Sequence, residues 1–292
     1  MTAPEMRTIT IGGLGNICTV SGRGQAAVLL HGSAGAKSQW TRLARLLEDR
    51  FQVFAPDLLG HGGTEPWRGL SPLSLGDEAM VIAALVRHVG QRVHLVGHSY
   101  GGAVALHFAQ SYPELLHSLV LIEPVAFHLL HFAGEKRARL LAAIESVATP
   151  LAEAANDHEG DETRRRAMAR FVDFWNGKGS WAAMSEERRL ATEAKARAVA
   201  AHFAATLGDR TSPTSYGRIA TPALVIYGAK TPEPTRIIAE SLVGLLPNAR
   251  AFRVDGAGHM APLTHAEIVN NAVAGHLNGA VLLGARGRRG AA

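Results

Sequence analysis

The chain has 292 residues, of which 47% are hydrophobic and 19% charged, and its net charge at pH 7 is +5. This composition is typical of a soluble globular protein with one core, or with a core and an inserted subdomain. The single cysteine, Cys18, excludes an intrachain disulfide, and we predict that it is a small buried side chain. Because no basic stripe interleaved with aromatic residues is present, we do not expect nucleic-acid binding.

The start of the sequence does not resemble a signal peptide, and its end is basic. The start, MTAPEMRTITIGG, lacks the apolar stretch of a signal peptide, and no run approaches the roughly 18 apolar residues of a membrane span. We therefore expect a cytoplasmic protein with no membrane partner. The chain closes on GARGRRGAA, which has nothing to bury, and we predict a flexible basic tail over residues 281–292.

Short apolar runs alternate with helical patterns along most of the chain. RTITIGG and NICTVSG, on either side of Leu14-Gly15, predict a β-hairpin. The later strand candidates are AAVLLHG, FQVFAPD, VHLVGHS, SLVLIEP, PALVIYG and ARAFRVDG. The central runs are rich in Val, Leu and Ile, as in strands covered on both faces. The alternation predicts an α/β fold with a mostly parallel, doubly wound sheet.

Capping patterns mark two of the intervening helices. Ser74 followed by Asp77 predicts a capping box at the start of one helix. Thr264 followed by Glu267 predicts the same arrangement at the start of the last helix.

One stretch, from about Val125 to Tyr216, contains no strand pattern and is helical, rich in Ala and Arg. An apolar stripe at helical spacing runs through it: Met168, Phe171, Phe174 and Trp175. Such a stripe fits packing within the stretch or the roof of a pocket. The stretch separates two sheet strands, and ligands of open parallel sheets bind beyond the carboxyl ends of the strands. We therefore predict a helical lid at that edge of the sheet.

The segment VHLVGHSYGGAVAL contains the pattern Gly-x-Ser-x-Gly at Gly97, Ser99 and Gly101, between a predicted strand and a predicted helix. A serine on such a tight turn has a strained backbone, so the positions two before and two after it accept almost no side chain. The turn raises the hydroxyl above the sheet edge. We predict that Ser99 is a catalytic nucleophile.

At this point the chain resembles the α/β-hydrolase fold family, in its form with an inserted helical cap. The likeness covers all but the tail and is carried by LLHGSAGAKSQW, FAPDLLGHGGT, VGHSYGG and GAGHMAPLTH. It implies an eight-stranded, mostly parallel sheet with helices on both faces and a helical lid. The implied organisation is a first core segment over 1–124, the lid over 125–216, a second core segment over 217–280 and the tail.

The remaining groups of a serine site follow from the motifs and the resemblance. His259, in a Gly-rich loop after the last strand, matches the late histidine of the order Ser, acid, His, and is the expected base. The amide directly after the nucleophile, that of Tyr100, should be one oxyanion donor. By resemblance the second donor is the amide of Ser33, with Ala34 as the alternative. We expect no cofactor and no metal.

The acid that should orient His259 is missing from its usual place. By resemblance that place is Thr231, which cannot carry the charge. Glu233 follows closely, but TPEP reads as a helix start in which Glu233 complements the helix dipole. Glu123 ends the strand after the elbow helix and should share the carboxyl edge with Ser99. We favour Glu123, as in certain haloalkane dehalogenases, with Glu233 open and Asp57 as a loop-bracing carboxylate.

These residues predict a serine hydrolase that cleaves a carboxylic ester or lactone of a small molecule through an acyl-enzyme. Carbon–carbon bond hydrolysis, thioester cleavage and perhydrolysis use nearly the same groups and remain alternatives. A ligand-binding protein that keeps the fold without turnover is the alternative from another class. The sequence does not indicate an oligomeric state.

Overall fold

The computed structural model describes residues 5–11, 14–156 and 160–289. Its centre is an eight-stranded sheet with the strand order β1-β2-β4-β3-β5-β6-β7-β8. The strands are β1 (Glu5–Ile11), β2 (Leu14–Gly22), β3 (Gln25–Leu30), β4 (Phe51–Pro56), β5 (Val93–His98), β6 (Leu116–Ile122), β7 (Ala223–Gly228) and β8 (Ala249–Val254). The pairs β1–β2 and β2–β4 are antiparallel and the others parallel, which confirms the predicted fold class and hairpin.

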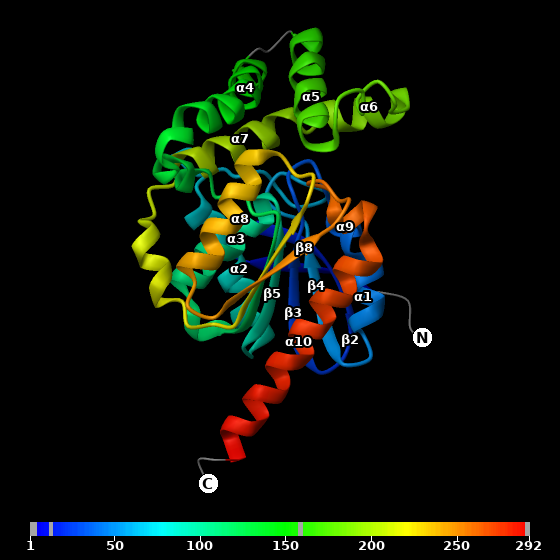
Figure 1. The fold of residues 1–292 in the computed structure, drawn as a ribbon. Helices are drawn as coiled ribbons and strands as arrows, with labels where there is room; N and C mark the ends of the chain where they lie inside the picture. The colour runs from blue at the N-terminus through cyan, green and yellow to red at the C-terminus, as the bar shows by residue number, and fades with distance from the viewer. Residues whose placement is uncertain (1–4, 12–13, 157–159, 290–292) are drawn as a thin grey trace.

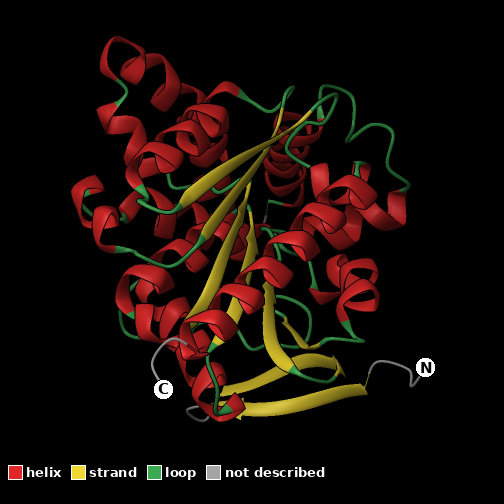
Figure 2. Ribbon diagram, turned by 60° about the horizontal axis from the view of Figure 1, so that its bottom comes forward, coloured by secondary structure: helices red, strands yellow, loops and turns green. Residues whose placement is uncertain are grey.

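Helices cover both faces of the sheet, as Figure 2 shows. On one face lie α2 (Leu75–Val89), α3 (Tyr100–Ser111) and α8 (Glu233–Leu245), and on the other lie α1 (Thr41–Leu47) and α10 (Ala266–Arg289). Strand β3 shows why: Val28 and Leu30 join the first core, whereas Ala27 and Leu29 join the second. Successive side chains point to opposite faces, so an uninterrupted apolar run feeds two cores at once.

Between β6 and β7 the chain leaves the sheet and forms a block of helices. Its α-helices are α4 (Arg137–Asn156), α5 (Asp161–Asn176), α6 (Glu186–Glu193) and α7 (Ala196–Gly208). They gather at the top of the molecule, beyond one end of the sheet (Figure 1). We call residues 125–216 the helical insertion; no strand lies within its described part. Its boundaries as a separate domain remain a prediction.

The helix ends agree with the sequence patterns in one case and not in another. Ser74 and Asp77 form the predicted capping box of α2. Thr264, in contrast, ends the short helix α9 (Ala261–Thr264), and its hydroxyl donates to the Met260 carbonyl, 3.2 Å away. The hydroxyl is thus turned back into α9, and α10 begins two residues later than predicted, at Ala266.

The two ends of the chain also bear on the sequence predictions. Helix α10 continues to Arg289, so residues 281–289 of the predicted flexible tail, 281–292, are helical, and the flexibility of this segment remains a prediction. Its Leu, Ala and Arg residues favour helix enough to extend α10 through the glycines. Residues 290–292 lie outside the described residues. Within the described ranges, no helix is long and apolar enough to cross a membrane. Cys18 is buried, as predicted.

Candidate active site

The predicted elbow forms at the turn from β5 into α3. Ser99 has φ 54° and ψ −117°, a conformation that non-glycine residues rarely adopt. A Cβ atom at Gly97 would lie 2.1 Å from the Gly101 carbonyl oxygen, and one at Gly101 would lie 2.4 Å from the Leu30 carbonyl oxygen. Both positions therefore require glycine, as the pattern Gly-x-Ser-x-Gly predicts.

Three side chains from distant parts of the chain meet at this turn. The Oγ atom of Ser99 lies 3.0 Å from His259 Nε2, and Nδ1 of the same ring lies 3.2 Å from Glu123 Oε2. Ser99 is 8% exposed, His259 2% and Glu123 0%. A serine, an imidazole and a carboxylate joined in this order can activate the hydroxyl and stabilise the imidazolium that forms.

Glu123 is the carboxylate that the structure brings to His259. It directly follows β6, which lies beside β5 in the sheet, and its carboxylate accepts hydrogen bonds from the Gly228 amide and the Thr231 hydroxyl. Thr231, the position where an aspartate is usual, therefore supports the acid instead of replacing it. A fully buried carboxylate requires such partners.

The alternative acid, Glu233, lies elsewhere. It forms a two-pronged ion pair with Arg139 of α4 and lies 3.8 Å from Arg236 of its own helix. The Arg139 hydrogen bonds lower the pKa of Glu233, together with the nearby positive charges. No contact between Glu233 and His259 occurs within the described residues.

Contacts to both the ring and the backbone hold His259 in place. Trp175 of α5 packs against it with ring centroids 4.1 Å apart, so the predicted apolar stripe does reach the site. His98 Nε2 lies 3.1 Å from the His259 carbonyl oxygen, and Gln39 Nε2 lies 3.2 Å from His98 Nδ1. Burial lowers the pKa of His98 to about 3, with a further contribution from His259, so His98 is neutral and supports the loop.

The two predicted oxyanion amides lie near the hydroxyl. Ser33, Ser99 and Tyr100 line one small pocket together. The Tyr100 amide opens α3, where helical N–H groups have no partner within the helix. The Ser33 amide donates to no backbone or side-chain acceptor in the part of the chain that the structure describes. Both amides are therefore available to a negatively charged oxygen.

Backbone strain is concentrated at this site. Among the described residues, the non-glycine residues with positive φ are Ala34 at 57°, Ser99 at 54° and Glu123 at 50°. Each follows a central strand of the sheet. Ser99 and Glu123 carry the hydroxyl and the carboxylate of the site, and Ala34 adjoins Ser33, whose amide is a predicted oxyanion donor. Unfavourable backbone conformations persist where surrounding contacts hold them, and they cluster at functional sites.

Beside Ser99 opens a pocket of about 450 Å³. Its apolar wall includes Phe171, Trp175 and Met184 of the helical insertion, and two cationic side chains, Arg188 and Lys195, also line it. None of the described residues that line it carries a carboxylate, so the pocket has a positive character. Within the described part of the chain, no three His, Cys, Asp or Glu side chains gather closely enough to hold a metal ion.

Two other residues complete the comparison with the sequence predictions. Asp57 accepts a 2.8 Å hydrogen bond from the Lys37 amide and one of 3.4 Å from the Gly63 amide, so it braces two loops, as predicted. His202, buried in α7, lies 2.9 Å from Ser33 Oγ through its Nδ1 atom. Sequence reasoning missed His202, because 169 residues separate the two and no motif marks it.

The family follows from comparison with known proteins. A family model described as the alpha/beta hydrolase fold matches residues 27–266. The chain belongs to the α/β hydrolase fold family. Solved structures agree: a hydrolase from Pseudomonas aeruginosa superimposes on 94% of this chain and 99% of its own, with TM-score 0.75 and 22% identity. A meta-cleavage product hydrolase covers 94% and 98%, with TM-score 0.69 and 19% identity. At these identities the likeness establishes the fold alone.

Curated relatives of this α/β hydrolase have different names. An uncharacterised protein of Mycobacterium tuberculosis is 34% identical over 119 residues, 41% of this chain but only 35% of that protein. Lipase LipV of the same species is 42% identical over 35% of this chain and 38% of its own. A putative 2-succinyl-6-hydroxy-2,4-cyclohexadiene-1-carboxylate synthase of Bacillus subtilis is 28% identical over 80% of this chain and 84% of its own. The match spans only about a third of the length of the first of these relatives, the uncharacterised M. tuberculosis protein.

Proposed function

We propose that this α/β hydrolase is a serine hydrolase that cleaves a carboxylic ester or lactone of a small molecule through an acyl-enzyme on Ser99. The observation that carries the proposal is the continuous chain of contacts from Ser99 Oγ through His259 to Glu123, at 3.0 and 3.2 Å. The likeness to a lipase over part of the chain supports ester chemistry.

In the proposed mechanism, His259 Nε2 takes the Ser99 proton as Oγ attacks the carbonyl carbon of the ester. Glu123 stabilises the resulting imidazolium through Nδ1–H. The amides of Ser33 and Tyr100 hold the negative charge on the carbonyl oxygen, and removing one such donor typically costs about 10²–10³ in turnover. His259 then protonates the leaving alkoxide. Water, deprotonated by His259, releases the acid and restores Ser99.

The proposed substrate is limited by the pocket. A volume of about 450 Å³ suits a small molecule rather than a long acyl chain. The apolar wall that includes Phe171 and Trp175 would hold the acyl part. We further propose that the helical insertion acts as a lid, because it supplies this wall.

The test is hydrolysis of p-nitrophenyl acetate and butyrate by the full chain. We expect a burst of p-nitrophenol followed by turnover, and a loss of about 10³-fold or more in Ser99→Ala. Labelling by a fluorophosphonate should add one phosphonyl group, placed on Ser99 by peptide mass spectrometry. Equal rates for wild type and Ser99→Ala would refute the hydrolase and favour a binding protein of this fold. Thioester and vinylogous diketone substrates in the same assay would separate the other hydrolytic reactions.

A further inference from the structure

The helical insertion contacts the turn that carries one predicted oxyanion donor, residues 33–34. His202 Nδ1 lies 2.9 Å from Ser33 Oγ, and Lys195 Nζ donates a 2.8 Å hydrogen bond to the Ala34 carbonyl oxygen. Lys195 precedes α7 and His202 lies two turns further along it. One helix thus reaches the turn at two consecutive residues. Desolvation by partial burial lowers the pKa of Lys195, because its ammonium group is partly withdrawn from water.

His202 also contacts the other predicted donor residue. Its ring stacks on Tyr100 with centroids 3.5 Å apart and planes 6° apart. The opposite neighbour is His61, stacked at 4.7 Å and 16°, and His61 Nε2 accepts a hydrogen bond from the Ala34 amide. The ring therefore touches both residues whose amides are proposed to bind the oxyanion, and it is 1% exposed.

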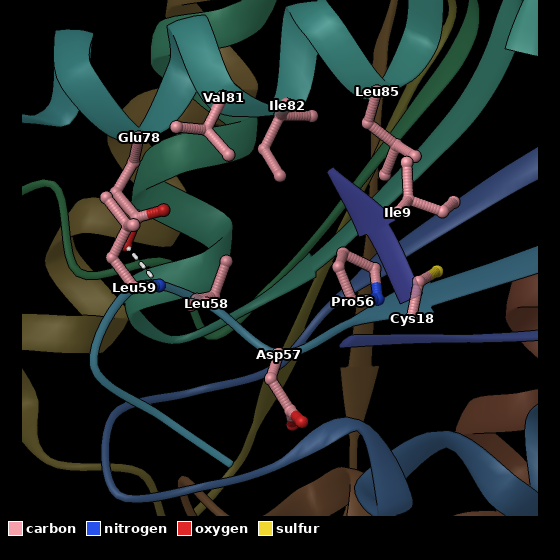
Figure 3. A pocket seen from close by; sticks show the side chains of 10 residues that line it. All are labelled: Ile9, Cys18, Pro56, Asp57, Leu58, Leu59, Glu78, Val81, Ile82 and Leu85. Atoms are coloured by element: carbon pink, nitrogen blue, oxygen red, sulfur yellow. Dashed lines mark hydrogen bonds between the residues drawn. The ribbon is translucent and has the colours of Figure 1, made fainter. Parts of the chain in front are cut away.

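Behind the ring lies Glu78 of the core, which forms no hydrogen bond with His202 Nε2. That Nε2 atom lies 4.0 Å from Glu78 Oε1, and that oxygen accepts a 3.2 Å hydrogen bond from the Leu59 amide. Figure 3 shows Glu78 descending from α2 with this hydrogen bond drawn. Burial lowers the pKa of His202 well below its usual range, and His61 and His31 add to this. The ring is therefore neutral and can share its Nδ1 hydrogen bond with a hydroxyl.

We propose that His202 and Lys195 are positioning residues that hold the 33–34 turn, and through it the Ser33 amide, in the geometry of the oxyanion hole. The helical insertion is then part of the catalytic apparatus and not only a cover. This inference rests on the proposed function, since an oxyanion hole needs an oxyanion.

The conformation of Ala34 shows why such support is needed. Its φ of 57° lies in the left-handed region, which alanine adopts only where contacts on several sides hold it. Those contacts are the His61, Lys195 and His202 hydrogen bonds to the turn. Without them the turn can relax and carry the Ser33 amide away from the reacting oxygen. Because the charge develops only in the transition state, the loss affects kcat and leaves KM nearly unchanged.

The test uses His202→Phe, which keeps a planar ring between Tyr100 and His61 but removes the hydrogen bond to Ser33. Lys195→Met keeps most of the aliphatic stem and removes the bond to Ala34. The matched control is His128→Phe, a buried insertion histidine that bonds Tyr216 and lies outside the pocket lining. Rates are referred to active sites titrated with a fluorophosphonate, so that misfolded protein does not count.

We expect kcat to fall about tenfold in His202→Phe and several-fold in Lys195→Met, with KM within twofold of wild type. The inhibition constant of a trifluoromethyl ketone, whose adduct places an oxyanion in the hole, should rise by the same factor. In His202→Phe, which keeps the charge of the pocket, the product carboxylate should bind as before. In Ser33→Ala/His202→Phe the two losses should not add, because they remove the same hydrogen bond.

Distinct outcomes separate this inference from the function beneath it. No Ser99-dependent turnover in wild type would refute the proposed function, and the inference with it. Normal wild-type turnover with kcat unchanged in His202→Phe would refute the inference alone. A loss of kcat with an unchanged inhibition constant for the trifluoromethyl ketone, or an equal loss in His128→Phe, would also refute it, because the effect would then not pass through the oxyanion hole.

Discussion

The hydroxyl of Thr231 donates a hydrogen bond to Glu123 Oε2, the same oxygen that lies 3.2 Å from His259 Nδ1. Residues after two strands, β6 and β7, thus together provide the oriented carboxylate that an aspartate at position 231 would provide alone. β6 brings the carboxylate, and the loop after β7 brings a donor that fixes it. The Thr231 hydroxyl is uncharged, but its hydrogen bond helps to hold the Glu123 carboxylate in position.

Replacing the proposed acid should abolish most of the activity. Glu123→Gln keeps the shape but removes the charge that stabilises the imidazolium, and we expect kcat to fall by about 10³–10⁴. Glu233→Gln is the matched control, since Glu233 pairs with Arg139 on the surface, and it should change kcat less than twofold. Steady-state hydrolysis of p-nitrophenyl butyrate measures both, with circular dichroism as the check on folding. A collapse only in Glu233→Gln would reverse the assignment.

The supporting hydroxyl should have a smaller effect. Thr231→Val keeps the volume and removes the donor, leaving Glu123 Oε2 with one partner fewer in a buried site. Hydrogen bonds to charged groups are worth about 1.5–3 kcal/mol, so we expect kcat to fall roughly tenfold or somewhat more. Thr231→Ser retains the hydroxyl and should stay within a few-fold of wild type. Identical kcat values for the valine and serine variants would contradict the role given to the hydroxyl.

The acid should also be movable from one strand to the other. Because Thr231 Oγ1 already lies within hydrogen-bond distance of Glu123 Oε2, an aspartate at 231 places a carboxylate close to His259. We expect Thr231→Asp in the Glu123→Gln background to recover at least tenfold of the lost kcat. Thr231→Asp alone should be impaired, since two adjacent carboxylates repel each other in a buried site and disturb the contact with His259. No recovery in the double variant would show that the imidazole cannot be reached from β7.

A different carboxyl group should make stability depend on pH. Burial raises the pKa of Glu78 to about 8, with the Leu59 amide opposing the shift. The folded state therefore holds this proton where the unfolded chain has lost it, and stability is lost as pH rises from about 4.5 to about 8. The loss is on the order of 4 kcal/mol by pH 8.

Urea unfolding at pH 5 and pH 8 measures this effect. Glu78→Gln cannot ionise, so its midpoint should fall less than that of wild type between the two pH values. Glu114→Gln, at an exposed carboxyl, should behave like wild type. The same pH dependence in wild type and Glu78→Gln would exclude Glu78 as its source.

Charge in the pocket should select among esters. Arg188 and Lys195 line the pocket, and no carboxylate of the described chain does, so an ester with an anionic end should bind better than a neutral one of equal size. In Arg188→Met we expect KM for p-nitrophenyl succinate to rise roughly three- to tenfold at low salt, and the difference to shrink as salt is added. KM for p-nitrophenyl butyrate is the internal control, and an equal rise for both esters would contradict the prediction.

The sequence predicts those parts of the molecule whose cause is local. The Gly97 and Gly101 pattern around Ser99 requires the elbow because of backbone clashes within a few residues, and the strands follow from short apolar runs. The start of α10 was wrong because Thr264 has a closer acceptor in α9 than the capping pattern assumes. Helix propensity extends α10 to Arg289, further than the sequence analysis expected, while the flexibility of the tail remains a prediction.

Contacts between distant segments set the limits of prediction. Glu123 and Glu233 both remained candidates for the acid, because they are distinguished only by which strands pair in the sheet and by which partner each carboxylate contacts. Arg139, whose side chain holds Glu233, lies 94 residues away and gives no signal in the sequence. The bond between Ser33 and His202 is of the same kind: fourteen histidines are present, and only the packing of α7 on the core singles this one out.

The three awkward dihedral angles at Ala34, Ser99 and Glu123 have a consequence for anyone who wishes to make the protein more heat-resistant. Glycine at these three positions would relieve the backbone strain, but each position determines the geometry of part of the candidate active site. Gains in melting temperature should therefore be sought elsewhere, on outward-facing helices and in the loops remote from the elbow. A screen that selects for thermal stability alone would be expected to return variants that are stable but inactive.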